Sequence, residues 1–241
     1  MPRFYINGGL SPESEVALPD NVVRHIHVLR LREGSEVVLF NGNGCAYPAQ
    51  LQRLDKRSAL AKVLRQEAAD KESSLDITLV QAVSGGDRMD FTLQKSVELG
   101  VGRIIPVWAA RSIVKLDAER AGKRVARWQE IVVSACEQSG RNVVPPVLPP
   151  AGFGEMLQCL PESDVRLLLG PNRAQSLCEA AEAPRKIVFM VGPEGGWTPE
   201  EEALALAADF RPVLLGKRIL RTETAALAAI AAMQTLWGDF V

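Results

Sequence analysis

Residues 191–201 read Val-Gly-Pro-Glu-Gly-Gly-Trp-Thr-Pro-Glu-Glu, and this stretch decides the fold class. It follows an apolar run, 186–191, and it ends at a helix start. Pro199 suits the first position of a helix, Thr198 is a capping residue, and Glu201 stands where a capping box needs an acid. A glycine-rich loop between a buried strand and a helix start is typical of α/β proteins, which bind ligands at the carboxyl edge of the sheet.

Two more loops with glycine follow predicted strands: Leu168-Leu-Gly-Pro-Asn172 and Leu215-Gly-Lys-Arg-Ile-Leu-Arg-Thr-Glu223. Glycine lets the backbone approach a ligand closely and leaves its amide and carbonyl groups free to bond. Such neutral loops suit the adenine and ribose of a nucleoside. The phosphate-binding pattern Gly-Lys-Ser/Thr is absent, and so is G-x-G-x-x-G after residues 76–82. Three loops at successive strand ends therefore predict a ligand site.

Strands and helices alternate around these loops. The predicted strands are Asp76–Ala82, Arg103–Trp108, Val165–Leu169, Lys186–Val191 and Pro212–Leu215, and the predicted helices are Asp87–Leu99, Ala118–Ser139, Pro199–Ala208 and Thr222–Trp237. Near-continuous apolar strands that alternate with helices predict a parallel sheet covered on both faces.

The first 70 residues are different, because their pattern is rich in strands. The predicted elements are a strand at Arg3–Ile6, a helix at Asp20–Leu29, strands at 35–40 and 45–51 joined by the turn Asn41-Gly-Asn-Gly44, and a strand at Ala59–Leu64. They predict a small barrel-like module. The charged stretch 66–74 is the predicted linker, which gives two domains, 1–70 and 75–241.

Composition excludes several classes of protein. The chain is 47% hydrophobic and 24% charged, which is ordinary for a soluble protein. Four scattered cysteines and two histidines predict neither a zinc site nor a disulfide scaffold, and they indicate reduced thiols in the cytoplasm. No stretch is long and apolar enough to span a bilayer, so we expect no membrane segment, no secretory signal and no metal.

Net charge is −1, which argues against a strongly basic nucleic-acid binder. A local basic patch nevertheless runs through 111–127, where six basic residues stand against Asp117 and Glu119: Arg111, Lys115, Arg120, Lys123, Arg124 and Arg127. Charge alone favours a solvated helix face for this patch.

The blocks at 191–201 and 215–225 closely resemble those of the ribosomal RNA small subunit methyltransferase E family, in the SPOUT superfamily. Further blocks along the whole chain resemble the family too: Arg3-Phe-Tyr, His27-Val-Leu-Arg-Leu-Arg-Glu-Gly34, Gln94-Lys-Ser-Val-Glu-Leu-Gly100 and Glu137-Gln-Ser-Gly-Arg141. The resemblance implies an α/β protein with an N-terminal PUA-like RNA-binding β-barrel, 1–70, and a C-terminal SPOUT domain, 75–241, that ends in a deep trefoil knot. General topology rules would have predicted an unknotted sheet.

The resemblance also implies the activity. Such enzymes are homodimers that use S-adenosylmethionine (SAM) to methylate N3 of one uridine in 16S rRNA, which makes the small ribosomal subunit the partner. Carried over to this sequence, the SAM-binding residues are Leu169, Gly170, Gly192, Glu194, Gly195, Leu215, Gly216, Ile219 and Leu220. The apolar ones among them are also candidates for the core, and Glu194 for a simple helix-start acid.

Methylation of uracil N3 requires a group that accepts the N3 proton or stabilises the negative charge that develops. Arg221 is the electrostatic candidate, because a guanidinium can hold a uracil carbonyl or a phosphate with two parallel donors. Glu223 is the candidate base, although an acid in the first turn also favours the helix dipole. The residues expected to bind RNA are Arg3, Arg111, Lys115, Lys123 and Arg124.

Two alternatives stay open. One is a SPOUT methyltransferase with another RNA target, such as a tRNA ribose 2′-hydroxyl. The other is a non-catalytic RNA-binding factor for ribosome assembly that keeps the fold.

Overall fold

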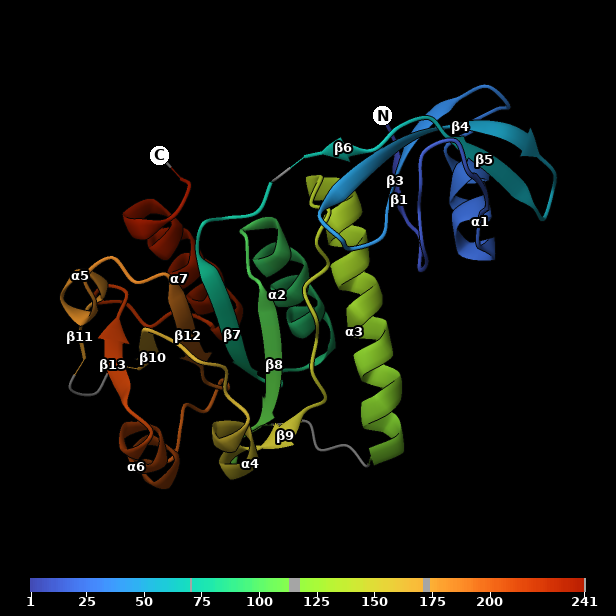
Figure 1. Cartoon of the computed structure of the whole chain (residues 1–241). Helices are drawn as coiled ribbons and strands as arrows, with labels where there is room; N and C mark the ends of the chain where they lie inside the picture. Colours follow the sequence, from blue (N-terminus) through green and yellow to red (C-terminus); the bar gives the residue numbers. More distant parts are fainter. Residues whose placement is uncertain (70, 113–117, 171–173, 241) are drawn as a thin grey trace. The chain divides into compact units, whose positions relative to one another are not determined.

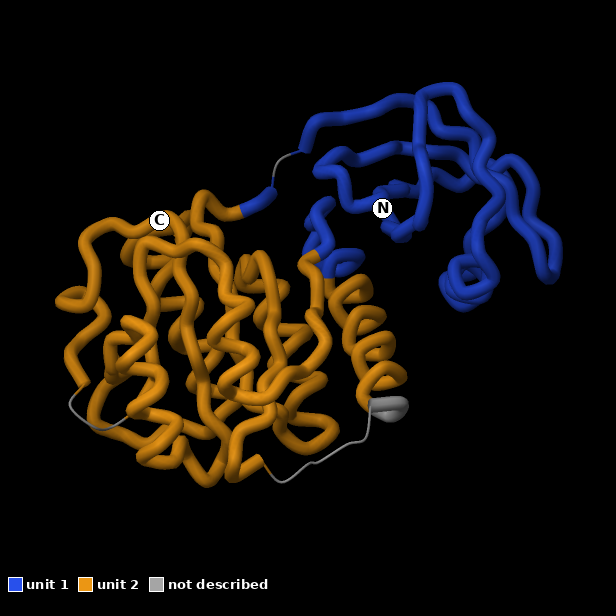
Figure 2. Tube along the Cα trace, turned by 60° about the horizontal axis from the view of Figure 1, so that its bottom comes forward, with its two compact units in different colours: residues 1–72, 136–144 blue, residues 73–135, 145–241 orange. Residues whose placement is uncertain are grey.

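The computed structural model describes residues 1–69, 71–112, 118–170 and 174–240. The chain divides into two compact units, coloured separately in Figure 2: unit 1 is Met1–Glu72 with Cys136–Val144, and unit 2 is Ser73–Ala135 with Pro145–Val241. The second segment of unit 1 is held by side chains, since Arg141 pairs with Glu72 and a carboxylate oxygen of Glu137 accepts the Tyr5 N–H at 3.0 Å. The predicted N-terminal domain, 1–70, does not include this second segment, because the sequence was divided at a single linker, 66–74.

Unit 1 contains short strands and one helix (Figure 1). Its elements are β1 (Arg3–Tyr5), β2 (Glu15–Ala17), α1 (Asp20–Val28), β3 (Glu36–Phe40), β4 (Cys45–Leu54), β5 (Ala59–Val63) and β6 (Glu67–Ala68). The predicted hairpin is confirmed, because β3 and β4 pair antiparallel around the turn that contains Gly42 and Gly44. Both glycines have positive φ, 89° and 87°, which a side chain would strain.

The sheet of unit 1 differs from the predicted barrel. Its strand order is β1-β3-β4-β5-β2, with β6 beside β4, and in the described residues no pairing joins β1 to β2. These two end strands have three residues each, so they offer few backbone groups for closing the sheet. Helix α1 buries Val22, Val23 and Ile26 in the core of this unit.

Unit 2 holds the alternating part of the chain. Its elements are β7 (Asp76–Ala82), α2 (Gly86–Glu98), β8 (Arg103–Trp108), most of α3 (Ala118–Ser139), β9 (Ala151–Gly152), α4 (Phe153–Gln158), β10 (Val165–Leu169), β11 (Gln175–Ser176), α5 (Leu177–Ala180), β12 (Lys186–Val191), α6 (Pro199–Ala207), β13 (Phe210–Leu214) and α7 (Thr222–Trp237).

The predicted parallel sheet is confirmed. Its order is β11-β13-β10-β12-β7-β8-β9, and every neighbouring pair is parallel. Strand β13 starts at Phe210, two residues before the predicted start, because Phe210 is a core residue only 2% exposed. In parallel strands the carboxyl ends share one edge, so the loops after β10, β12 and β13 come together there.

Both faces of the sheet are covered. Val80, Val188 and Met190 share one face and pack with Phe153 and Met156 of α4 and with Ala205 of α6. Since side chains alternate along a strand, Gln81 points to the other face, where it donates a hydrogen bond to Thr222 of α7. Helix α2 packs against α7.

Candidate active site

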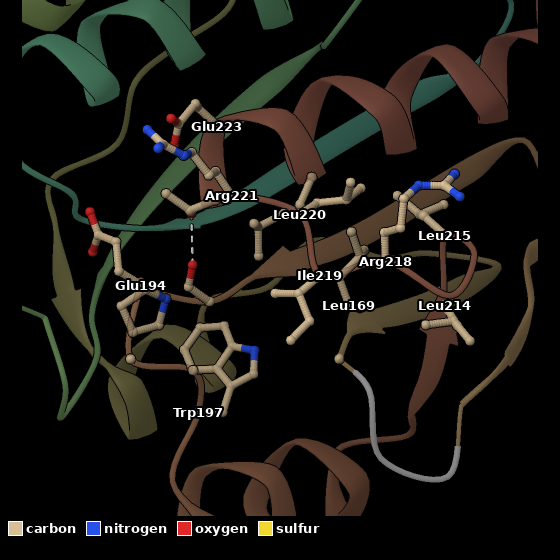
Figure 3. A pocket seen from close by; sticks show the side chains of 18 of the residues that line it. Leu169, Glu194, Trp197, Leu214, Leu215, Arg218, Ile219, Leu220, Arg221 and Glu223 are labelled. Carbon is tan, nitrogen blue, oxygen red and sulfur yellow. Dashed lines mark hydrogen bonds between the residues drawn. The ribbon is translucent and has the colours of Figure 1, made fainter.

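A pocket of about 730 Å³ lies at the carboxyl ends of β10, β12 and β13 (Figure 3). The three strands are neighbours in the sheet, in the order β13-β10-β12. Their following loops form the walls, together with the start of α7. This volume lies within the range of about 300–1,000 Å³ that small-molecule sites occupy.

The structure brings the residues predicted to bind the cofactor into this one pocket. All nine line it: Leu169, Gly170, Gly192, Glu194, Gly195, Leu215, Gly216, Ile219 and Leu220. Both predicted catalytic residues, Arg221 and Glu223, line it as well. They come from loops far apart in the sequence that only the sheet places side by side.

The loop after β12 is fixed at its far end by the predicted capping box. Thr198 Oγ1 accepts the N–H of Glu201 at 3.2 Å, and a carboxylate oxygen of Glu201 accepts the N–H of Thr198 at 2.9 Å. The other carboxylate oxygen of Glu201 accepts the N–H of Ala110 at 2.8 Å. Glu201 is 6% exposed, so these bonds compensate a buried charge and anchor the loop to the segment after β8.

Trp197 packs beneath the start of the same loop. Its indole ring is 6% exposed and lies edge-to-face against Phe153, with ring centroids 5.4 Å apart. A Cβ built on Gly192 would lie 3.1 Å from Trp197 Nε1, which is tighter than ordinary contact. Glycine at 192 therefore lets the backbone lie against the ring without displacing it.

One side of the pocket, called the apolar side, carries Leu169, Leu215 and Ile219 with Arg218 among them, and the other, called the charged side, carries Glu194, Arg221 and Glu223 (Figure 3). Ile219 is 98% exposed. The apolar side fits a flat or aliphatic group, and the charged side offers carboxylates and guanidinium groups to a polar one.

The two carboxylates on the charged side differ in their polar partners. Glu194 pairs with Arg88 at 2.5 Å. One carboxylate oxygen of Glu223, Oε2, is buried and has no hydrogen-bond partner. Arg221 precedes Glu223 by two residues and is the N-cap residue of α7. Arg221 and Glu223 both line the pocket, so it contains a guanidinium group that can stabilise a developing anion and a carboxylate that can accept a proton.

The residues predicted to bind RNA are dispersed. Arg111 lines the pocket, where its Nη1 donates to the carbonyl oxygens of Gly195 at 2.9 Å and Trp197 at 3.2 Å. It therefore braces the loop after β12. Lys123 and Arg124 lie on α3, outside the pocket.

The two remaining predicted residues have other surroundings. Lys115 lies outside the described residues. Arg3 lies in unit 1, where its guanidinium donates to Asn142 Oδ1 at 2.5 Å and stacks over the Phe40 ring at 5.2 Å. Burial lowers the pKa of Arg3, while Cys136 and Glu137 oppose this effect.

Several lining residues were not predicted from the sequence, and two of them, Arg88 and Trp197, make contacts that depend on the fold. Arg88 stands in the first turn of α2 and reaches Glu194 across 106 residues of sequence, and no local pattern indicates such a pairing. Trp197 was part of a quoted block, but its contact with Gly192 depends on the fold.

Neither a metal centre nor a membrane segment is found in the part of the chain that the structure describes. No group of three or more His, Cys, Asp or Glu side chains there is arranged to hold a metal ion. No described helix combines the length and the apolar character needed to cross a bilayer.

Both units of the chain match families of RNA methyltransferase domains. Residues 71–234 match the family described as an RNA methyltransferase domain, and residues 18–64 match the RNA methyltransferase PUA domain. The first match covers most of unit 2 with the pocket, and the second lies in unit 1. The chain thus has the two domains of an RNA methyltransferase.

Individual relatives narrow the class. Ribosomal RNA small subunit methyltransferase E of Buchnera aphidicola (strain APS) is 30% identical over 100% of this chain and 95% of the relative. The protein of the same name from Bacillus subtilis is 31% identical over 88% and 86%. The chain belongs to the ribosomal RNA small subunit methyltransferase E family.

Solved structures agree with this assignment. The enzyme of this family from Neisseria gonorrhoeae, bound to SAM, superposes with a TM-score of 0.94 at 58% identity over 100% of both chains. A methyltransferase from Legionella pneumophila in complex with SAM has a TM-score of 0.95 at 34% identity, over 99% of this chain and 98% of that one.

Proposed function

We propose that the chain is a SAM-dependent methyltransferase that transfers a methyl group to N3 of one uridine in 16S rRNA of the small ribosomal subunit. The observation that carries the proposal is the pocket at the carboxyl ends of β10, β12 and β13, lined by all nine residues expected to bind the cofactor. Two structural relatives that superpose over almost the whole chain contain SAM. Membership of the family supports the rRNA target.

The pocket fits SAM in size and chemistry. Its glycine-containing loops offer backbone groups to adenine and ribose, and Gly170 has no atom within 4 Å of the place where a Cβ would stand. Ile219, at 98% exposure, presents apolar surface that a bound nucleoside would remove from water. We assign Leu169, Leu215 and Ile219, together with Gly192, Glu194 and Gly195 of the loop after β12, to the cofactor. Bound there, SAM supplies the electrophilic methyl group.

The part of the charged side with Arg221 and Glu223 is the proposed place of the target base. Arg221 would hold a uracil carbonyl with two parallel hydrogen bonds and stabilise negative charge as N3 loses its proton. Glu223, which lines the same pocket, would accept that proton. Arg88 neutralises Glu194 and so limits the negative charge that an approaching RNA encounters.

RNA would be bound by unit 1, which contains the region matching a PUA domain, and by Lys123 and Arg124 on α3.

We further propose a homodimer, and a deep trefoil knot formed by the loops around the pocket. The position of β13 supports the knot, since this strand follows β12 in sequence but pairs on the opposite side of β10. The alanine-rich helix α7 offers small side chains for close packing of a second copy. An rRNA substrate and four free cysteines support a cytoplasmic location.

The test is methyl transfer from labelled SAM to three substrates: small subunits from a strain that lacks the gene, naked 16S rRNA, and tRNA. The proposal predicts incorporation into small subunits or their rRNA. Incorporation into tRNA alone would favour the other methyltransferase hypothesis. RNA binding with no transfer to any substrate would favour a non-catalytic assembly factor.

A further inference from the structure

Gln81 is a polar side chain in an apolar strand. It stands near the end of β7, where Ile77, Leu79 and Val80 are all fully buried, and it is itself 0% exposed. A buried amide lowers stability unless its hydrogen bonds are made. Nε2 donates to the carbonyl oxygen of Ala82 at 3.1 Å and to Thr222 Oγ1 at 3.0 Å, but Oε1 has no partner. The residue is therefore not optimal for stability alone.

The bond to Thr222 has a fixed direction. A hydroxyl group has one hydrogen, and Thr222 Oγ1 accepts the hydrogen of Gln81 Nε2. Its own hydrogen points to the carbonyl oxygen of Gly192, 2.7 Å away, as the dashed line in Figure 3 marks. Thr222 is 6% exposed, so this chain of two hydrogen bonds is shielded from water. It runs from β7 through the first residue of α7 to the loop after β12.

We propose that Gln81 and Thr222 are positioning residues that fix the start of α7 against Gly192. They thereby keep the loop after β12 and the loop before α7, the two main walls of the cofactor pocket, and Arg221 in fixed positions relative to one another. This proposal rests on the proposed function. Gly192 is held between the Thr222 hydroxyl and the Trp197 ring, and Thr222 follows Arg221 directly in the chain.

The loop that this relay anchors has little packing of its own. Ile219 is 98% exposed, and Gly216 has a positive φ of 89°. Side-chain burial therefore does not hold residues 216–219 in place. The register of β7 and β12 places Gln81 beside Val191, immediately before Gly192, so the relay starts from the rigid sheet.

Thr222→Val tests the relay, because it keeps the branched shape and removes the hydroxyl. We expect SAM affinity, measured by calorimetry, to fall about tenfold, which corresponds to about 1.4 kcal/mol. At saturating SAM, kcat on small subunits should fall by a similar factor. Thr222→Ser, which restores the hydroxyl, should recover most of both. The matched control is Thr235→Val on the same helix, since the Thr235 hydroxyl is exposed and donates to the Ala231 carbonyl of its own helix, at 2.9 Å.

A merely structural role would lower Tm and leave both SAM affinity and kcat at saturating SAM unchanged. Gln81→Met separates the two roles. It removes the unpartnered Oε1 and the Nε2 donor of the relay, and it replaces the amide by an apolar side chain of similar length. We expect its Tm to equal or exceed that of the wild type, while kcat falls about threefold. If Thr222→Val does not fold, Gln81→Met decides by this criterion.

Wild-type values of both SAM affinity and kcat in the folded variants would overturn the relay. A change in either beyond that of Thr235→Val supports it. Wild-type protein that binds SAM but transfers no methyl group overturns the proposed function instead. The relay is then judged by SAM affinity, which requires no RNA.

Discussion

Gly192→Ala is the substitution whose effect on the free energy of unfolding follows most directly from the packing of the pocket. The added Cβ would lie 3.1 Å from Trp197 Nε1 and 3.2 Å from Trp197 Cε2, so the ring must move by a few tenths of an ångström. That ring is 6% exposed and packed against Phe153, so it moves only at the expense of the core. Overpacking of this kind costs about 1–3 kcal/mol. In a chain of this size each kcal/mol lowers Tm by about 2–4 °C.

The assay is thermal unfolding with and without SAM. Gly192→Ala should unfold at a lower temperature than the wild type. SAM should also raise its Tm by less, because a ligand stabilises the folded state according to its affinity, and the displaced loop should bind SAM more weakly. Gly154→Ala on α4 is the control: its Cβ meets no atom within 4 Å, and alanine favours a helix by about 0.5–1 kcal/mol, so Tm should hold or rise. Gly170→Ala, which projects into open pocket space, should keep its Tm and lose SAM affinity. A wild-type Tm for Gly192→Ala would refute the reasoning.

Three further predictions concern other parts of the molecule. Arg221→Ala should lower kcat about 10²–10³-fold with little change in SAM affinity, and Arg221→Lys should rescue little; equal losses of Tm, SAM affinity and rate would instead indicate a structural clamp. Replacing Lys123 and Arg124 together with Ala should weaken RNA binding and flatten its salt dependence while SAM binding stays constant; an unchanged salt slope would leave the patch as a solvated helix face. Burial raises the pKa of the Cys136 thiol to about 12, and Arg141 partly offsets this. Because the thiolate is the reactive form, native protein at pH 8 should be alkylated at exposed Cys159 and not at Cys136, which mass spectrometry of the labelled peptides checks.

Long elements of unit 2 were predictable because each carries its own signal. Strands β7, β8, β10 and β12 and helices α3 and α7 have the predicted bounds, since long apolar runs and helical periodicity are local properties. Elements of two to six residues, such as β9 and α4, are too short to show a period. Their formation depends on the sheet edge and core that they complete.

The candidate site divides in the same way. Its glycine loops were identified from their sequence and the resemblance, and the fold gathers them in one pocket. The Arg88–Glu194 pair and the Gln81–Thr222 bond join residues 106 and 141 positions apart, so no local pattern contains them. Arg111 was predicted to bind RNA as part of the basic patch at 111–127. Its bonds to two carbonyl oxygens of the pocket loop appear only in the folded chain.

Methylation of a uracil base at N3 leaves a product nucleoside, 3-methyluridine, that can be identified by its mass and retention. Small subunits from a strain lacking the gene are incubated with the protein and SAM, and their 16S rRNA is digested to nucleosides for mass spectrometry. We expect one new 3-methyluridine per subunit, absent when SAM is omitted and strongly reduced with Arg221→Ala. A methyl group on a ribose 2′-hydroxyl, or no new methylated nucleoside from protein that binds SAM, would contradict this expectation.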